Sequence, residues 1–249
     1  MSLVRRSLLT ATFAAVAAAT LSAGALAWGQ EQVKGDGKIV KEARPLESFD
    51  GIALAGPFEL KLRQADTQRV ELEADSNLLP LVETRIVSGA KGKTLEVQVK
   101  KGYSVYSKQP LRIAVDAATL RRLAIAGSGK AEIEALKTDK VDFSVAGSGT
   151  VLVPQLEAGS VKMSVAGSGD IRAAGKAAEL EVSIAGSGDI RAFDLAGDEV
   201  KVSIAGSGDA EVQANKKLKI SIAGSGDVRY TGAAEPSTSV AGSGSVKRR

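Results

Sequence analysis

The second half of the chain alternates apolar positions with small or polar ones, at the period of two that β-strands require. Residues 163–172, with the sequence MSVAGSGDIR, are one example. In this phase one set of side chains is predicted to point inward, namely Val165, Ile184, Ile204 and Ile222. The serines that precede them are predicted to point outward, namely Ser164, Ser183, Ser203 and Ser221. The pattern therefore predicts strands with one buried and one exposed face.

The tetrapeptide Ala-Gly-Ser-Gly recurs seven times between Ala126 and Gly244, in steps of 20, 20, 19, 20, 18 and 18 residues. This period is too short for helical repeats or propeller blades, and the frame of leucine-rich repeats is absent. It fits one coil of a parallel β-helix, in which each coil buries its apolar side against its neighbours. The predicted fold class is all-β: a single-domain parallel β-helix, or solenoid, with about 18–20 residues per coil and an N-terminal β-rich cap.

The two glycines of each repeat are predicted to turn the corners of the coils. Such corners need a positive φ angle, or no side chain where backbones crowd together. A phosphate-binding loop would be followed by a helix and a lysine, whereas each copy here is followed by another strand. These structural repeat glycines are Gly127, Gly129, Gly147, Gly149, Gly167, Gly169, Gly186, Gly188, Gly206, Gly208, Gly224, Gly226, Gly242 and Gly244.

The region ahead of the repeats also has strand patterns and no Pro- or Ser-rich linker, so residues 45–249 are predicted to form one domain. Its parts are an N-terminal β-rich part, residues 45–125, and the repeat coils, residues 126–249. The strands expected in the first part are residues 51–54, 58–63, 70–74, 95–99 and 111–115, with a helical turn at 77–81 and a hairpin turn at 89–93. We expect this part to cover the open end of the solenoid, and the charges at residues 247–249 to discourage pairing at the other end.

Residues 1–27 are predicted to be a secretory signal peptide, followed by a polar N-terminal lead at residues 28–44. Arg5 and Arg6 precede an apolar stretch, and Ala25-Leu26-Ala27 fits the cleavage pattern. The protein is therefore expected to be exported, to the periplasm or to the extracellular cell surface. No later segment approaches the roughly 20 apolar residues of a membrane span, so none is expected after cleavage.

Composition excludes several kinds of chemistry. The chain has no cysteine and no histidine, which rules out disulfides, thiolate metal sites and Ser-His-Asp catalysis. Loss of Arg5 and Arg6 leaves 31 of the 33 basic residues against 29 acidic ones, a net charge of +2. A nearly neutral domain argues against nucleic acid as a partner. The sequence predicts no catalytic residue, no cofactor and no metal site.

The residue after each tetrapeptide forms its own column, and four of these residues are aspartates: Asp170, Asp189, Asp209 and Asp227. Stacked carboxylates could form a ladder that binds cations such as Ca²⁺. Arginines two residues further on favour a different interpretation, a row of ion pairs. The expected pairs are Asp170 with Arg172, Asp189 with Arg191, and Asp227 with Arg229.

Three stretches carry a resemblance to a known family: residues 49–58 (FDGIALAGPF), residues 77–79 (NLL) and residues 120–129 (LRRLAIAGSG). Together with the repeated S-x-A-G-S-G-D pattern, they resemble the bacterial head GIN domain family, labelled putative auto-transporter adhesin and formerly a domain of unknown function. The resemblance covers roughly residues 45–246. It implies an exported, β-helix-like protein and supplies no catalytic residues.

The expected function is that of an exported, non-enzymatic envelope or surface interaction protein. Its outward Ser and Ala columns would offer an adhesin-like repetitive face to an unknown protein or polysaccharide surface. Two alternatives stay open: a β-helix polysaccharide lyase or hydrolase, since carboxylates can act without histidine, and a periplasmic structural or scaffold protein. Coils of 18–20 residues leave little room for the walls of a catalytic cleft. The sequence leaves the oligomeric state open.

Overall fold

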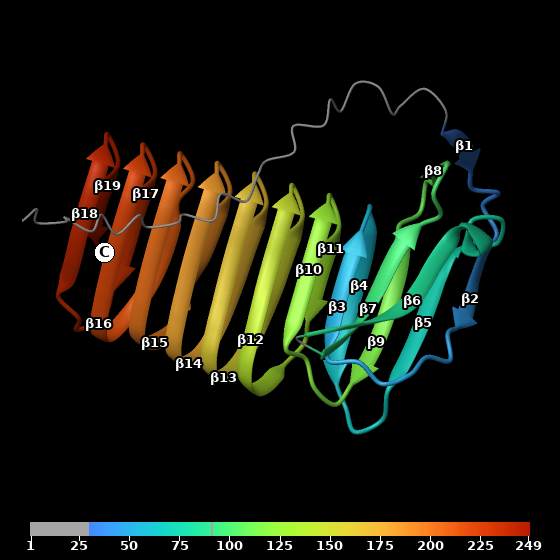
Figure 1. Ribbon diagram of the computed structural model, residues 1–249, viewed down its shortest axis with the longest axis horizontal. Coiled ribbons are helices and arrows are strands. Elements are labelled where there is room, and N and C mark those ends of the chain that lie inside the picture. The colour runs from blue at the N-terminus through green and yellow to red at the C-terminus, as the bar shows by residue number, and fades with distance from the viewer. Residues whose placement is uncertain (1–29, 91) are drawn as a thin grey trace, which may run out of the picture.

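The computed structural model describes residues 30–90 and 92–249, and it shows a solenoid of about six turns built from stacked strands (Figure 1). Neighbouring coils pair in parallel and largely in register. The central strands are β12 (Leu136–Gly147), β13 (Thr150–Gly167), β14 (Asp170–Gly186), β15 (Asp189–Gly206) and β16 (Ala210–Gly224). The flanking coils contain β10 (Arg122–Gly127), β11 (Lys130–Ile133), β17 (Asp227–Thr231), β18 (Pro236–Gly242) and β19 (Ser245–Arg248). The predicted parallel solenoid is confirmed.

The core is a set of apolar columns that run through the coils. Val165 lies opposite Ile184, Ile184 opposite Ile204, and Ile204 opposite Ile222. All four side chains are at most 3% exposed, which confirms their inward assignment. Burying one such side chain stabilises the fold by about 1.5–3 kcal/mol. No coil buries these side chains alone, so stability depends on contact between neighbouring coils.

The corner glycines are required by the backbone, as Gly186 and Gly188 illustrate. Gly186 has a φ of +127°, a conformation that L side chains rarely adopt. Gly188 has no such φ, but a Cβ atom there would lie 2.3 Å from the carbonyl oxygen of Gly169 in the previous coil. The first glycine is thus needed for its φ angle and the second for close approach. Both properties are those expected of glycines at the corners of the coils.

The N-terminal part covers one end of the solenoid, as expected. The strands of this cap are β2 (Ile39–Ala43), β3 (Gly51–Ala55), β4 (Phe58–Gln64), β5 (Arg69–Asp75), β6 (Val82–Gly89), β7 (Gly92–Val99) and β9 (Leu111–Ala117). β3 and β4 pair in parallel with β10 and β11 and so continue the stack, and β7 and β9 extend it by pairing in parallel with β3 and β4. Beyond them, β5 and β6 pair antiparallel with β9 and β7, and β2 pairs antiparallel with β5. The change to antiparallel pairing ends the regular stack at this edge.

Shorter features of the cap agree with the sequence as well. A 3₁₀ turn at Leu79–Leu81 occupies the predicted helical turn, and the β6–β7 hairpin closes at Gly89 and Gly92. The described part of the N-terminal lead, residues 30–44, holds two strands: β1 (Glu31–Lys34), parallel to β8 (Tyr103–Tyr106), and β2. Buried Asp75 connects this segment to the cap, because its carboxylate accepts hydrogen bonds from Gly37 N–H and the Ser107 hydroxyl.

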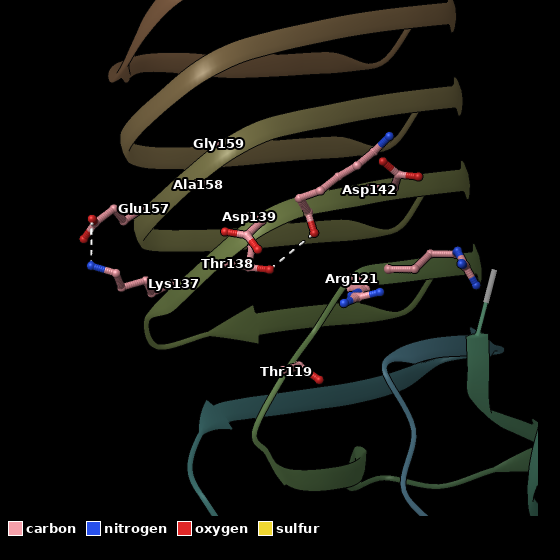
Figure 2. A pocket seen from close by; sticks show the side chains of 11 residues that line it. Thr119, Arg121, Lys137, Thr138, Asp139, Asp142, Glu157, Ala158 and Gly159 are labelled. Carbon is pink, nitrogen blue, oxygen red and sulfur yellow. Dashed lines mark hydrogen bonds and ion pairs between the residues drawn. The ribbon is translucent and has the colours of Figure 1, made fainter.

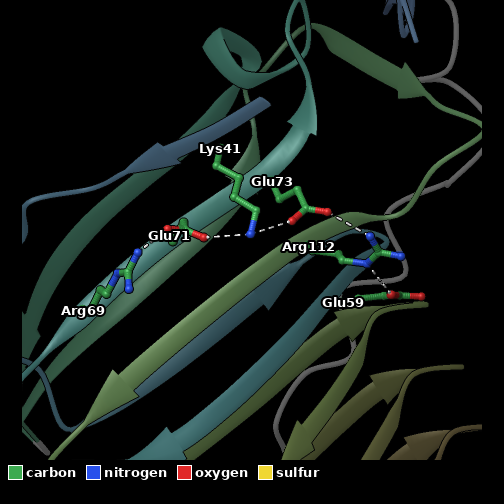
Figure 3. A network of polar contacts seen from close by, with 6 residues as sticks. All are labelled: Lys41, Glu59, Arg69, Glu71, Glu73 and Arg112. Atoms are coloured by element: carbon green, nitrogen blue, oxygen red, sulfur yellow. Dashed lines mark hydrogen bonds and ion pairs between the residues drawn. The ribbon is translucent and has the colours of Figure 1, made fainter. Parts of the chain in front are cut away.

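A network of charged side chains lies across β2, β5, β9 and β4 of the cap (Figure 3). The Lys41 ammonium lies 3.4 Å from a Glu71 oxygen and 3.3 Å from a Glu73 oxygen. Arg112 contacts Glu73 at 2.9 Å and Glu59 at 3.7 Å. The network joins strands that are distant in sequence and belongs to the cap rather than to the repeat coils.

The C-terminal basic residues contact their own chain. Arg248 donates a hydrogen bond to the carbonyl oxygen of Gly232 and lies over the Tyr230 ring, and Arg249 lies over the Phe193 ring. Their effect on edge pairing stays a prediction. The signal peptide prediction falls outside the described residues. Within residues 30–90 and 92–249, no helix is long and apolar enough to cross a membrane.

Candidate binding surfaces

One side of the solenoid carries two neighbouring columns of small residues, which we call the flat face. In-register stacking aligns the outward serines of successive coils, and the alanines two residues further on align beside them. The serines are half-buried and the alanines exposed. The flat face consists of Ser144, Ser164, Ser183, Ser203 and Ser221 with Ala146, Ala166, Ala185, Ala205 and Ala223. Neighbouring coils are about 4.8 Å apart, so hydroxyl groups repeat along the face at that interval.

The flat face ends in a shallow hollow at the cap. The columns continue into β10 and β3 as Ala124, Ala126, Ala53 and Ala55. The β6–β7 hairpin then rises beside them, with Arg85 paired to Glu96 at 2.7 Å. The hollow between these elements has a volume of about 320 Å³. The face therefore has a polar wall at one end.

A row of charged residues borders the flat face, two positions before the serines. Lys162 and Lys201 both contact Glu181 in the coil between them, at 3.5 and 3.7 Å. Asp142 and Lys219 continue the same register. Within this row Lys162, Glu181 and Lys201 pair with one another, and exposed pairs of this kind contribute little to stability.

The aspartate column lies on another side of the coils, and its contacts only partly match the prediction. Arg191 pairs with Asp189 at 2.8 Å, as expected, and also reaches Asp170 at 3.9 Å. Arg229 does not form the expected direct ion pair with Asp227: it contacts Glu211 of the previous coil at 3.2 Å, while its charge still helps to lower the pKa of the Asp227 carboxyl. Within the part of the chain that the structure describes, Arg172 forms no ion pair with Asp170 either, and the cation near Asp170 is Arg191. Neighbouring coils are about 4.8 Å apart and residues two apart on one strand about 6.6 Å apart, so an arginine can reach a carboxylate of either kind, and Arg191 contacts one of each.

The remaining aspartates hold the corner of the next coil. Asp209 accepts a hydrogen bond from Asp227 N–H, and Asp227 accepts hydrogen bonds from the Ser245 hydroxyl and backbone N–H. These bonds from Ser245 lower the pKa of the Asp227 carboxyl below its ordinary value. Among the described residues, no group of three or more acidic side chains is arranged to hold a metal ion. The column therefore fits hydrogen-bonding and ion-pair roles, and cation binding stays untested.

A groove of about 820 Å³ lies where the cap meets the repeat coils (Figure 2). The segment before β10 contributes Thr119 and Arg121, and the bend of β12 contributes Lys137, Thr138 and Asp139, with the next coil on the far side. Lys137 pairs with Glu157 across the two coils at 2.9 Å. The full lining is Thr119, Arg121, Arg122, Lys137, Thr138, Asp139, Lys140, Asp142, Glu157, Ala158 and Gly159.

This groove was missed by the sequence analysis. Its residues come from separate segments that only coil stacking and the cap bring together. One signal was available: Arg122, Asp142, Lys162 and Glu181 occupy equivalent places before the Ser column, so their alternating charges could have been read from the repeat.

Comparison with known proteins agrees with this architecture. The family model described as "Putative auto-transporter adhesin, head GIN domain" matches residues 48–234. No curated protein matches the chain.

Several solved structures share the fold. The crystal structure of a putative adhesin from Bacteroides fragilis NCTC 9343 matches with a TM-score of 0.82 at 23% identity, covering 87% of this chain and all of that one. A putative lipid binding protein from Parabacteroides distasonis ATCC 8503 matches with a TM-score of 0.74 at 25% identity, covering 88% and 100%. A putative adhesin from Parabacteroides merdae ATCC 43184 matches with a TM-score of 0.71 at 28% identity, covering 88% and 99%.

Proposed function

The chain belongs to the head GIN domain family of putative auto-transporter adhesins, and on this premise we propose that it is an exported, non-enzymatic envelope or surface protein that binds a repetitive partner surface through the flat face. The observation that carries the proposal is the continuity of the Ser and Ala columns over five coils, from β12 to β16. Residues at equal spacing offer the same contact many times, and repeated weak contacts add up to firm attachment.

The chemistry of the face favours a protein or polysaccharide partner. Serine hydroxyls donate and accept hydrogen bonds, and the exposed alanines let a partner approach closely. One structural relative is named a putative lipid binding protein, but the flat face lacks the large apolar side chains that a lipid surface would bury. The exposed large hydrophobic residues of the described chain lie elsewhere: Ile39, Val40, Val87, Tyr106 and Val240.

A matched pair of substitutions on one strand tests the flat face. Ala185→Glu places a charged side chain in the middle of the Ala column, and Ala178→Glu makes the same change at an exposed alanine of β14 outside the face. Labelled protein, residues 28–249, is mixed with intact cells and isolated envelopes of the bacterium that produces it. We expect wild type and Ala178→Glu to bind equally and Ala185→Glu to bind at least about tenfold more weakly, a change of about 1.4 kcal/mol.

Thermal melting of both variants controls for folding, because both positions are exposed and should tolerate the substitution. Equal binding of the two variants, or no binding by wild type, would contradict the flat-face proposal.

Protease treatment of intact cells distinguishes the outer cell surface from the periplasm as the location of the protein. Degradation while a periplasmic control survives supports a role in adhesion at the outer surface, whereas protection until the outer membrane is opened supports binding within the periplasm.

A further inference from the structure

The groove of Figure 2 combines two cations that form no ion pair among the described residues with a carboxylate oxygen that lacks a donor. Arg121 and Lys140 are exposed and form no side-chain ion pair within residues 30–90 and 92–249. Asp142 Oδ1 is buried and accepts no hydrogen bond from the described residues. A buried acceptor without a donor costs about 1–3 kcal/mol, and because the Asp142 side chain as a whole is only half-buried, rotation of its carboxylate would bring an oxygen to a ligand hydroxyl.

The backbone holds these groups in place. Arg121 N–H donates to the Asp50 carbonyl oxygen at 2.7 Å, and Asp142 N–H donates to the Arg121 carbonyl oxygen at 3.0 Å. The Arg122 guanidinium donates to the Thr94 hydroxyl at 3.2 Å. The groove is therefore built on strands of the cap and the first coils.

A second hollow, of about 620 Å³, continues the groove along the bends of the coils. The two share Lys137 and Glu157, whose ion pair lies at the junction between them. The second hollow adds the exposed cation Lys176 and the exposed amide of Gln155. Together they form an elongated, open channel, which suits several units of a chain better than one small molecule.

We propose that this groove binds an acidic saccharide, a sugar chain that carries carboxylate groups. The cations Arg121, Lys140 and Lys176 would bind the carboxylates, while Asp142 and Asp139 would accept hydrogen bonds from sugar hydroxyls. Each sugar unit of such a chain presents both an anion and several hydroxyl donors, matching the mixture of charges that lines the groove.

Other ligand classes fit less well. No aromatic residue lines either hollow, so neither stacking with bases nor packing against the faces of neutral sugars is provided. An acidic peptide would bring its carboxylates against Asp139, Asp142 and Glu157 without supplying hydroxyl donors in return. The mixture of cations and carboxylates in the groove therefore favours an acidic saccharide, which also carries hydroxyl groups, over an acidic peptide.

The groove adjoins the flat face, since Asp142 lies two residues before Ser144 on the outward side of β12. The inference rests on the proposed function in one respect: it takes the protein to bind saccharide without cleaving it. The two remain separable, because the groove is tested with a defined soluble probe and the flat face with cells and envelopes.

The experiment measures binding of oligogalacturonate to residues 28–249 by calorimetry at low ionic strength. The double variant Arg121→Gln/Lys140→Gln removes the two cations, and Arg172→Gln/Lys108→Gln removes two exposed cations outside the groove. Both variants have the same net charge. We expect the first to bind at least about tenfold more weakly than wild type and the second to bind within about twofold of it. Added salt should weaken wild-type binding.

Two further probes test the ligand class. Neutral malto-oligosaccharide and polyglutamate should bind at least about tenfold more weakly than oligogalacturonate. Asp142→Asn should weaken oligogalacturonate binding without weakening that of polyglutamate, because only the sugar donates hydroxyl groups to this oxygen.

Several outcomes would overturn the assignment. Comparable binding of polyglutamate would indicate an acidic-peptide site, and comparable binding of malto-oligosaccharide would show that the carboxylate is not recognised. Equal loss in the two double variants, or no oligogalacturonate binding by wild type, would exclude the groove. Ala185→Glu should retain oligogalacturonate binding. The groove proposal can therefore hold even if the binding experiments with cells contradict the flat-face proposal. Release of new reducing ends would show cleavage and contradict the non-enzymatic function.

Discussion

Single residues at the corners decide whether coils can stack at all. Each Gly-Ser-Gly corner places one glycine at positive φ and another beneath the backbone of the previous coil. The serine between them is exposed, and its N–H still donates to the glycine carbonyl of the neighbouring coil, as Ser187 does to Gly167 at 2.8 Å. The corner thus keeps the interstrand hydrogen bonds while the chain changes direction.

Substitutions at one corner should differ sharply in their effect. Gly186→Ala forces a side chain into a φ of +127° and places its Cβ 2.5 Å from the Gly167 carbonyl oxygen. We expect it to lower the free energy of unfolding by about 1–3 kcal/mol, the usual cost of such strain. Ser187→Ala, at an exposed position, should change it by less than about 0.5 kcal/mol. Urea titrations measure both, and equal midpoints would contradict the assigned role of Gly186.

At the scale of elements, the charge network links four strands of the cap to one another: β2, β5, β9 and β4 (Figure 3). The hydrogen bond from Arg112, followed by that from Lys41, lowers the pKa of Glu73 below its ordinary value. Hydrogen bonds to Glu73 and Glu71 raise the pKa of Lys41. The ionised forms of both groups are thus favoured by folding.

These shifts predict how the stability of the cap depends on pH. Because the folded-state pKa of Glu73 is lowered, its contribution is present above the unfolded value of about 4.5 and is lost as pH falls through the folded value. Lys41 also stabilises the cap, but with the opposite pH dependence: its contribution is present at neutral and acidic pH and is lost only as pH rises above its raised pKa. Glu73→Gln should therefore be less stable than wild type at pH 7 and lose less stability between about pH 5 and pH 3.

The measurement is a series of urea titrations across this pH range. Glu179→Gln is the matched control and should follow wild type, because Glu179 lies at an exposed position of β14 and forms no ion pair with the other described residues. Parallel curves for Glu73→Gln and wild type would show that the network does not stabilise the cap.

At the scale of the whole molecule, the repeat coils behave as interchangeable layers between two unlike ends. The N-terminal end changes to antiparallel pairing in the cap, whereas the coils from β12 to β16 contact mainly their immediate neighbours. In such an arrangement, stability is approximately a sum over coils and the contacts between them.

Removing one whole coil should therefore preserve the fold. Deletion of residues 187–206 joins Gly186 to Ser207 and restores an intact Ala-Gly-Ser-Gly corner, with β14 against β16. We expect a folded protein whose urea m-value is lower by about a tenth, since m scales with the surface exposed on unfolding. Deletion of residues 187–196 removes half a coil and misaligns the apolar columns, so it should unfold the C-terminal coils. Circular dichroism distinguishes the two, and failure of the whole-coil deletion to fold would contradict the layered description.

The sequence by itself determined the solenoid, its inward columns and its corner glycines. These features follow from local rules: a period of two selects the buried face of a strand, and seven tetrapeptides at nearly constant spacing set the length of the coil. Ile204 is buried and Gly186 has a positive φ for reasons that a repeat of about 20 residues already contains. The flat face could be predicted as well, because stacking in register converts a repeated residue into a column.

Only the tertiary structure decided which charges meet. Arg229 pairs with Glu211 of the previous coil, whereas Arg191 makes its shorter contact with Asp189 on its own strand, although both arginines follow an aspartate at the same spacing in the sequence. The antiparallel pairing of β2 with β5 and of β5 with β9 depends on how the chain returns across the end of the stack. The groove likewise needs Arg121, Asp142 and Glu157 from three segments to converge where cap and coils join. Contacts of this kind depend on the distance between layers, which no local pattern specifies.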